Sequence, residues 1–170
     1  MTFSEALLQR QREQGPVIQN IGDVVINAAL DWGPAYCHYA RYYPFADATI
    51  KAEKARNTTF DQFLTAFTRR PATRKLAVHS YQTRITIRLQ RYILLLKGIL
   101  KQTPEDNADR PALLQAIDII DQQCKESDAA VAASEAVLEC RRYHKELVGQ
   151  DGYLSVSLGC SGLFQRFLML

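Results

Sequence analysis

One stretch restricts the possible folds of this chain more than any other: residues 81–103, which read YQTRITIRLQRYILLLKGILKQT. It is long, strongly apolar and interrupted by arginines, and Pro104 follows it directly. Proline ends a helix because it lacks the backbone N–H and its ring clashes with the preceding turn. We therefore predict that residues 73–103 form the central helix of an all-α domain, and that this helix carries the surface for a partner.

A rotation of about 100° per residue divides the predicted helix into two faces. The face that we expect in the core consists of Tyr81, Ile85, Leu89, Tyr92, Leu96 and Ile99. The second face mixes polar, basic and apolar residues and consists of Ser80, Arg84, Ile87, Arg88 and Arg91, flanked by Thr83 and Gln90. Such a mixture is typical of protein-binding surfaces, although a solvated basic face without a role has the same composition. Residues 94–96 make the second half apolar nearly all round, so we expect that half to be buried.

The sequence before the central helix also has helical spacing and shows no alternating strand pattern. Residues 3–14 can form a short amphipathic helix, which Gly15 and Pro16 interrupt. Apolar residues recur at helical spacing again from Val17, and Pro34 is predicted to kink or restart that helix.

Two more helices complete the pattern. One begins at residues 57–59 and ends at the Arg-Arg-Pro of residues 69–71. The last runs over about 112–148, and Asp109 is the predicted cap of its first turn. Four or more long helices with short breaks predict an all-α bundle.

Composition limits the class of protein. The chain has 170 residues, 47% hydrophobic and 23% charged, which suits one globular domain. We predict that domain over 1–148 and an appended tail over 149–170, which is rich in glycine and serine and then apolar. The net charge of +3 does not indicate a nucleic-acid partner, and no stretch predicts membrane insertion or a signal peptide. We therefore expect a cytoplasmic protein.

No residue pattern indicates catalysis, a metal or a cofactor. The four cysteines form no CxxC pair and have no zinc spacing, so we expect reduced thiols. The three histidines, His38, His79 and His144, are far apart and belong to no ligand pattern. We expect no catalytic residue, no metal ligand and no cofactor in this chain.

Three stretches resemble one known family. Residues 88–107, RLQRYILLLKGILKQTPEDN, resemble the third conserved region of Dbl-homology (DH) domains, the exchange factors for Rho-family GTPases. Residues 21–40, IGDVVINAALDWGPAYCHYA, and 57–81, NTTFDQFLTAFTRRPATRKLAVHSY, are similar to the middle of the same domain. Within this family, the sequences of these stretches resemble the fungal Rho1 exchange factors most.

This resemblance implies an elongated helical bundle and a guanine-nucleotide exchange function. The family binds the nucleotide-free GTPase more tightly than its GDP-bound form, and this difference promotes GDP release without covalent chemistry. The implied partner is a Rho1-like small GTPase. By register, the GTPase-binding residues would be Ser80, Thr83, Ile87, Arg88, Gln90, Arg91 and, late in the last helix, Asp128.

The sequence departs from the family pattern at several places. Asp128 stands where the family often has Asn, and a carboxylate accepts hydrogen bonds but cannot donate them. Two prolines usual in the family are replaced at Ile85 and Ile93, which predicts a straighter helix. No match to the family's early helix, with its switch-contacting glutamate, is found. We therefore expect a domain that is incomplete at its N-terminal helix, weak or inactive in exchange, and self-associating through uncovered apolar surface.

Two other functions remain open from the sequence. The chain can be a non-catalytic helical interaction module that keeps the DH fold and binds a protein without exchange. Nucleic-acid binding by the arginine face is the least favoured function, because the interleaved aromatics have the pattern of a core.

Overall fold

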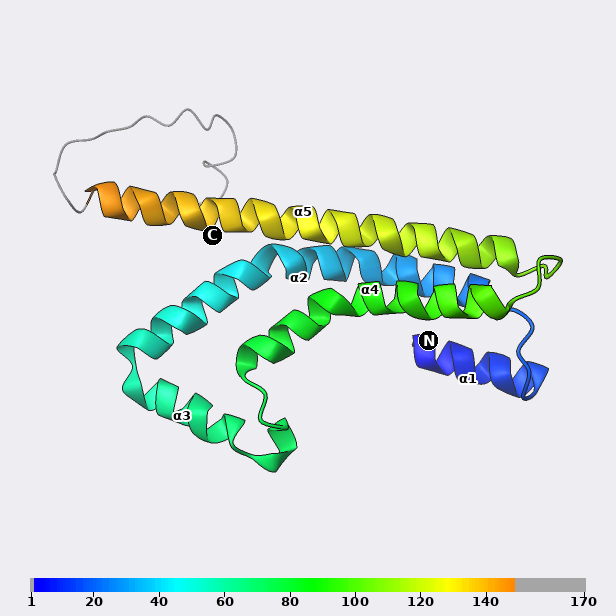
Figure 1. Cartoon of the computed structure of the whole chain (residues 1–170), viewed down its shortest axis with the longest axis horizontal. Helices are drawn as coiled ribbons and strands as arrows, with labels where there is room; N and C mark the ends of the chain where they lie inside the picture. Colours follow the sequence, from blue (N-terminus) through cyan, green and yellow to red (C-terminus); the bar gives the residue numbers. More distant parts are fainter. Residues whose placement is uncertain (1, 149–170) are drawn as a thin grey trace. The chain divides into compact units, whose positions relative to one another are not determined.

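The computed structural model describes residues 2–148, and the predicted tail over 149–170 lies outside the described residues (Figure 1). Within residues 2–148 the chain forms α-helices and one short 3₁₀ turn, and no strand. The elements are α1 (Phe3–Gln14), α2 (Gly22–Arg56), α3 (Thr58–Thr68), the turn η1 (Pro71–Thr73), α4 (Val78–Gln102) and α5 (Arg110–Val148). The predicted all-α class is confirmed.

The chain divides into two compact units, Met1–Ala136 and Val137–Leu170. The described residues of the second unit continue α5 as a solvated helix, along which Arg142 pairs with Glu139 at 3.6 Å and with Glu146 at 3.7 Å. No described helix is long and apolar enough to cross a membrane.

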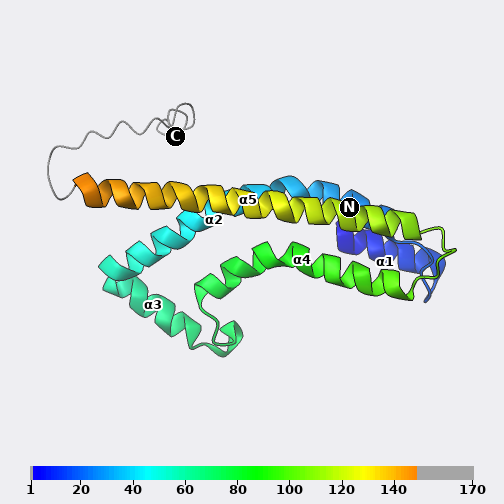
Figure 2. The same ribbon diagram turned by 45° about the horizontal axis from the view of Figure 1, so that its top comes forward.

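Helix α2 does not restart at Pro34. It runs unbroken for 35 residues with Pro34 and Pro44 inside it, and Figures 1 and 2 show it bent along its length. A proline removes one N–H donor and disturbs the carbonyls of the preceding turn. Two buried side chains of α5 supply donors beside these turns: Gln123 Nε2 bonds the carbonyl of Ala29 at 2.7 Å, and Ser134 Oγ bonds that of Arg41 at 2.7 Å.

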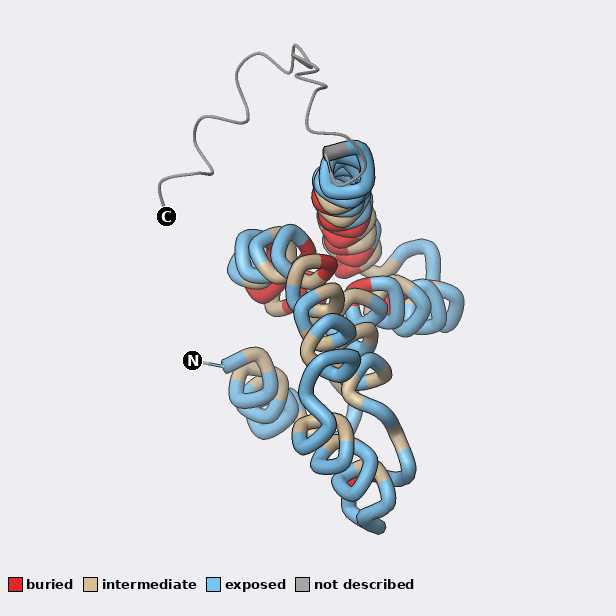
Figure 3. The backbone as a smooth tube through the Cα atoms, turned by 90° about the vertical axis from the view of Figure 1, so that its left-hand side faces the viewer, coloured by how far each residue is buried: buried red, intermediate tan, exposed pale blue. Residues whose placement is uncertain are grey.

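The core lies where α2, α4 and α5 meet, and buried positions gather on the sides of these helices that face one another (Figure 3). Its members are Val25 and Ala29 of α2, Leu89 and Leu96 of α4, and Leu113, Ala116, Ile120 and Cys124 of α5. Ala29 and Ala116 are completely buried, and their small side chains allow the helix backbones to approach. Leu89, Leu113 and Ile120 fill the remaining space, and truncating any of them would cost about 2–5 kcal/mol.

Helix α4 begins five residues later than predicted. Residues 71–73 form η1 instead, and Arg74 and Lys75 follow with positive φ angles of 51° and 59°. A left-handed residue cannot continue a right-handed helix. The buried Thr73 holds this turn, because its hydroxyl bonds the carbonyl of Arg70 at 2.7 Å and its own carbonyl accepts the Tyr81 hydroxyl at 2.8 Å.

The predicted straight central helix is also corrected. Helix α4 is continuous, but Figures 1 and 2 show it bent in its first part. The Tyr39 hydroxyl of α2 donates to the Gln82 carbonyl at 3.1 Å, and the hydroxyls of Thr83 and Thr86 bond carbonyls of the preceding turn. Donors that compete for helix carbonyls bend helices even without proline.

Candidate functional site

The outward side of α4 follows from its two buried leucines. Leu89 and Leu96, seven residues apart, point into the core, so residues displaced by roughly 100° or more from Leu89 face away from it. We define the α4 outer face as five exposed residues that meet this criterion, Ile87, Gln90, Arg91, Leu94 and Leu95. Arg84 and Arg88 meet it as well but contact the rings of Tyr81 and Tyr92, so they are not included. The outer face combines one cation, one amide and three apolar side chains.

Ile87, Gln90 and Arg91 were predicted binding residues, and the structure places them together on the outer face. Within residues 2–148, neither Gln90 nor Arg91 makes a hydrogen bond or an ion pair, and the Ile87 side chain is 43% exposed. These three side chains therefore keep their bonding capacity and apolar surface for a partner.

Ser80 and Thr83 lie on the first turns of α4 and are half-buried. The Thr83 hydroxyl donates to the carbonyl of His79 at 3.1 Å. Helix α2 holds this part of α4: His79 Nδ1 lies 3.1 Å from the Asp47 carboxylate and 3.5 Å from the Tyr43 hydroxyl. Lys51 and His79 bond that carboxylate, and although burial opposes them, they lower the pKa of Asp47.

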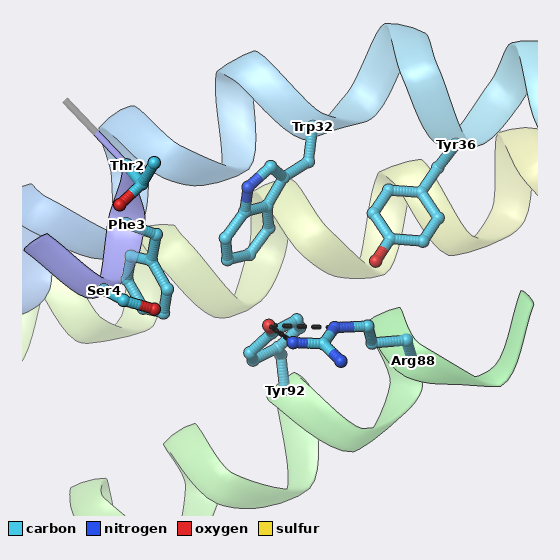
Figure 4. Close-up of a pocket in the computed structure, with 7 residues that line it drawn as sticks. All are labelled: Thr2, Phe3, Ser4, Trp32, Tyr36, Arg88 and Tyr92. Carbon is cyan, nitrogen blue, oxygen red and sulfur yellow. Dashed lines mark hydrogen bonds between the residues drawn. The ribbon is translucent and has the colours of Figure 1, made fainter. Parts of the chain in front are cut away.

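Arg88 is separated from the outer face by its own contacts. Its Nε and Nη2 donate to the Tyr92 hydroxyl at 3.1 and 2.9 Å, one turn along α4. The hydrogen bond to the Tyr92 phenol raises the pKa of the Arg88 guanidinium. Figure 4 shows that the side chain reaches toward Trp32 and Tyr36 of α2. Arg88 and Arg91 are both exposed, but only Arg88 is held by an internal hydrogen bond. That the two guanidiniums form one binding surface stays a prediction.

Asp128 is exposed on α5, next to the buried Ser127. It lies five full turns from Arg110, whose guanidinium bonds the carbonyls of Leu100 and Thr103, so it belongs to the flank of α5 that turns toward α4. In the described part of the chain, no hydrogen bond or ion pair joins Asp128 to the predicted residues of α4.

Two residues of the outer face were not found from the sequence. The second half of α4 was expected to be buried, but only Leu96 is, whereas Leu94 is 69% and Leu95 63% exposed. Three successive helical residues span about 200°, so they cannot all face one core, and this was the available signal. Three members of the expected core face, Tyr81, Ile85 and Ile99, are likewise about two-fifths exposed.

Among residues 2–148, no group of three or more His, Cys, Asp or Glu side chains is arranged to hold a metal ion. What the arrangement offers is a partly apolar surface for a macromolecule.

Comparison with known proteins agrees with this arrangement. The sequence profile of the RhoGEF domain matches residues 1–128. The chain belongs to the RhoGEF domain family. The predicted resemblance is thereby confirmed, and the matched residues include all of α1 to α4, the outer face and Asp128.

Relatives within the RhoGEF family include fungal and animal proteins. The chain is 39% identical over 140 residues to Rho1 guanine nucleotide exchange factor 3 of Schizosaccharomyces pombe, and the match covers 82% of this chain and 11% of that protein. It is 28% identical over 145 residues to Rho guanine nucleotide exchange factor 11 of Homo sapiens, covering 81% of this chain and 9% of that protein. The chain thus spans roughly a tenth of the length of these relatives.

A solved RhoGEF structure shares the fold. The crystal structure of the PDZ-RhoGEF DH/PH domains in complex with GTP-γS-activated RhoA matches with a TM-score of 0.70 and 25% sequence identity. The match covers 78% of this chain and 38% of that chain. The helices that carry the candidate site therefore have the arrangement of a DH domain.

Proposed function

We propose that this chain is a guanine-nucleotide exchange domain for a Rho-family small GTPase of the Rho1 type, and that the domain spans residues 1–148. The proposed contacts are Ser80, Thr83, Ile87, Arg88, Gln90, Arg91 and Asp128. One observation carries the proposal: α4 presents an exposed, uncompensated Arg91 between apolar side chains on a DH-type fold. We place this contact in the cytoplasm, where such a GTPase regulator would meet its partner.

The proposed mechanism uses binding energy alone. The domain binds the nucleotide-free GTPase more tightly than the GDP-bound GTPase, so the complex offsets part of the cost of losing GDP. A ligand shifts such an equilibrium only by its difference in affinity for the two forms. No covalent step is required, and no side chain of the domain acts as acid, base or nucleophile.

Within this proposal Arg91 and Arg88 have different roles. Arg91 is exposed and unpaired in residues 2–148, so its guanidinium can reach a carboxylate of the GTPase without first breaking an internal bond. Arg88 already bonds Tyr92 and lies beside the aromatic side chains of α2. Arg88 therefore contributes at the margin of the interface.

The exchange experiment is direct. GDP release from a Rho-type GTPase loaded with fluorescent GDP is followed with and without the chain, and with Arg91→Ala. We expect the chain to accelerate release and Arg91→Ala to reduce that acceleration by about tenfold, as for a central interface arginine. Arg12→Ala is the matched control, because Arg12 is exposed on α1 and unpaired in the described residues. Equal loss in both variants would contradict the proposed surface.

The second candidate function is a non-catalytic interaction module with the same fold. Two observations favour this function. Arg88 is bonded to Tyr92, and within the described residues no bond joins Asp128 to α4. The proposed contact residues are therefore not held together as one site. Binding to nucleotide-free GTPase without faster GDP release would identify this function. Absence of binding to that form would exclude the exchange function and a module directed at the GTPase, and would leave a module that binds another protein.

Self-association is a further proposal for the isolated chain. Leu94 and Leu95 are adjacent, largely exposed and unpartnered on the outer face. Apolar surface of this kind is removed from water when two copies meet. A partner GTPase that uses the same face would compete with this association.

A further inference from the structure

A cavity of about 230 Å³ lies where the start of α1 meets α2 and α4, beside the outer face but not on it. Figure 4 shows the side chains that line it: Thr2, Phe3, Ser4, Trp32, Tyr36, Arg88 and Tyr92. Cavities for drug-sized ligands have about 300–1,000 Å³, so this one suits a single side chain with its neighbouring backbone.

The walls of the cavity are aromatic and mutually supported. Trp32 stacks on Tyr92 with ring centroids 4.7 Å apart and an interplanar angle of 23°. Phe3 meets Trp32 edge-on at 5.0 Å and Tyr92 at 6.2 Å. Rings packed in this way lose little freedom when a ligand enters, so the apolar part of the site is already formed.

A fixed but uncompensated cation stands in this aromatic setting. Arg88 donates to Tyr92 through Nε and Nη2, which holds the guanidinium in place. The edge formed by Nη1 and the second hydrogen of Nη2 makes no hydrogen bond in residues 2–148, and no carboxylate of these residues pairs with Arg88. A guanidinium edge with two parallel N–H groups is the preferred partner of a carboxylate.

Two hydroxyl groups of the cavity wall are also available. The hydroxyls of Tyr36 and Ser4 make no hydrogen bond within the described residues. Burial raises the pKa of Tyr36, so its hydroxyl stays protonated near neutral pH and can donate. The site thus offers N–H and O–H donors, one positive charge and apolar walls, but no second cation among its lining residues.

The geometry points to a binding site for the side-chain carboxylate of a glutamate or aspartate in a peptide segment whose neighbouring residue is apolar. The carboxylate pairs with the free edge of Arg88 and accepts from Tyr36, while the apolar neighbour packs on Trp32 and Phe3. A phosphate group fits less well, because a single guanidinium leaves most of its charge unmatched. This site does not depend on exchange activity.

Trp32 is the one tryptophan of the sequence, so its fluorescence reports the cavity directly. The full chain is titrated at low salt with the peptide acetyl-Leu-Glu-Leu-amide and with its Gln counterpart. We expect a saturable change in Trp32 emission with the Glu peptide, and affinity for the Gln peptide about tenfold weaker, as expected for loss of a charge-assisted hydrogen bond. No saturable change up to millimolar peptide, or equal affinities, would overturn the site.

Variants assign the preference to named groups. Arg88→Gln should abolish the difference between the two peptides, Tyr36→Phe should reduce it, and Arg12→Gln should leave it intact. Circular dichroism checks that each variant keeps its helices. If Arg88→Gln unfolds, Arg88→Lys replaces it, because lysine keeps the positive charge but lacks the two parallel N–H groups of the guanidinium. A Glu preference that survives in folded Arg88→Gln, or that is undiminished in Arg88→Lys, would overturn the assignment. Displacement of the Glu peptide by inorganic phosphate at equal concentration would overturn it as well.

Discussion

The carboxylate of Asp109, just before α5, caps the start of α2 at Gly22. Its Oδ1 accepts the Gly22 N–H at 3.0 Å and its Oδ2 accepts the Ile21 N–H at 2.8 Å. Asp109 is buried, and the residue before α2 offers no side-chain cap of its own. One side chain thus satisfies donors that a helix start leaves open, and it fixes the ends of two helices to each other.

Replacing Asp109 with Ala should therefore destabilise the chain. The substitution leaves two backbone donors without a partner where solvent is largely excluded, at a cost of about 1–3 kcal/mol. The free energy of unfolding from urea titrations measures this loss. Asp106→Ala is the matched control, because Asp106 is exposed in the same loop and makes no hydrogen bond or ion pair within residues 2–148. A loss as large in the control would show that the cap is not the cause.

Gly22 and Gly98 should respond in opposite directions to alanine. A Cβ at Gly22 would lie 2.5 Å from the Cβ of Ala112 and 2.8 Å from Oδ1 of Asp109, so the helix ends would have to separate. A Cβ at the exposed Gly98 of α4 would meet nothing within 4 Å. We expect Gly22→Ala to lower the thermal midpoint and Gly98→Ala to raise stability by up to about 1 kcal/mol, the helix preference of alanine over glycine. Stabilisation by both variants would refute the close approach.

The pairing of Asp23 with Arg10 predicts a dependence of stability on pH. The two side chains are 2.6 Å apart, and the hydrogen bond from Arg10 lowers the pKa of Asp23 below its ordinary value of 3.8. A lowered native pKa gives stability that is fully present above the ordinary value and is lost as the pH falls through the native value. Asp23→Asn should therefore reduce the difference between urea midpoints at pH 5.5 and pH 3, and Asp31→Asn, exposed on the same helix, should not. Because Asp23 is more than half exposed, solvent screening keeps this effect small.

The sequence predicts local features of this chain better than it predicts burial. The helical class and the burial of Leu89 and Leu96 follow from spacing alone. Spacing also shows that residues 94–96 cannot all face one core, but which of them are exposed depends on which sides of α4 the other helices cover. Pro34 was predicted to kink or restart its helix; α2 bends but runs unbroken, and the donor that compensates nearby, Gln123 of α5, lies 94 residues later in the sequence.

The site residues show the same limit. Register places Ile87, Gln90 and Arg91 on one surface, and the structure agrees. Arg88 differs, because its hydroxyl partner on Tyr92 and the aromatic side chains of α2 draw it to another side. Asp109 was predicted to cap its own helix, and it caps α2 instead. The partners of Asp109 lie 87 and 88 residues away, and a local pattern carries no information about them. For Arg88 the partner Tyr92 is only one turn along α4, but the pattern of residue types does not show that the two side chains bond.

The two exposed leucines of the outer face give the last prediction. If Leu94 and Leu95 mediate contact between copies, the double substitution to glutamate should remove concentration-dependent sedimentation, because two charges on each copy would lose hydration at the contact. Folding should be nearly unaffected, within about 0.5 kcal/mol, since both side chains are already in water. Leu114→Glu, at a position 49% exposed on α5, is the control and should sediment like the unmodified chain. Sedimentation of the double variant that still depends on concentration would place the contact elsewhere and leave the outer face free for the GTPase alone.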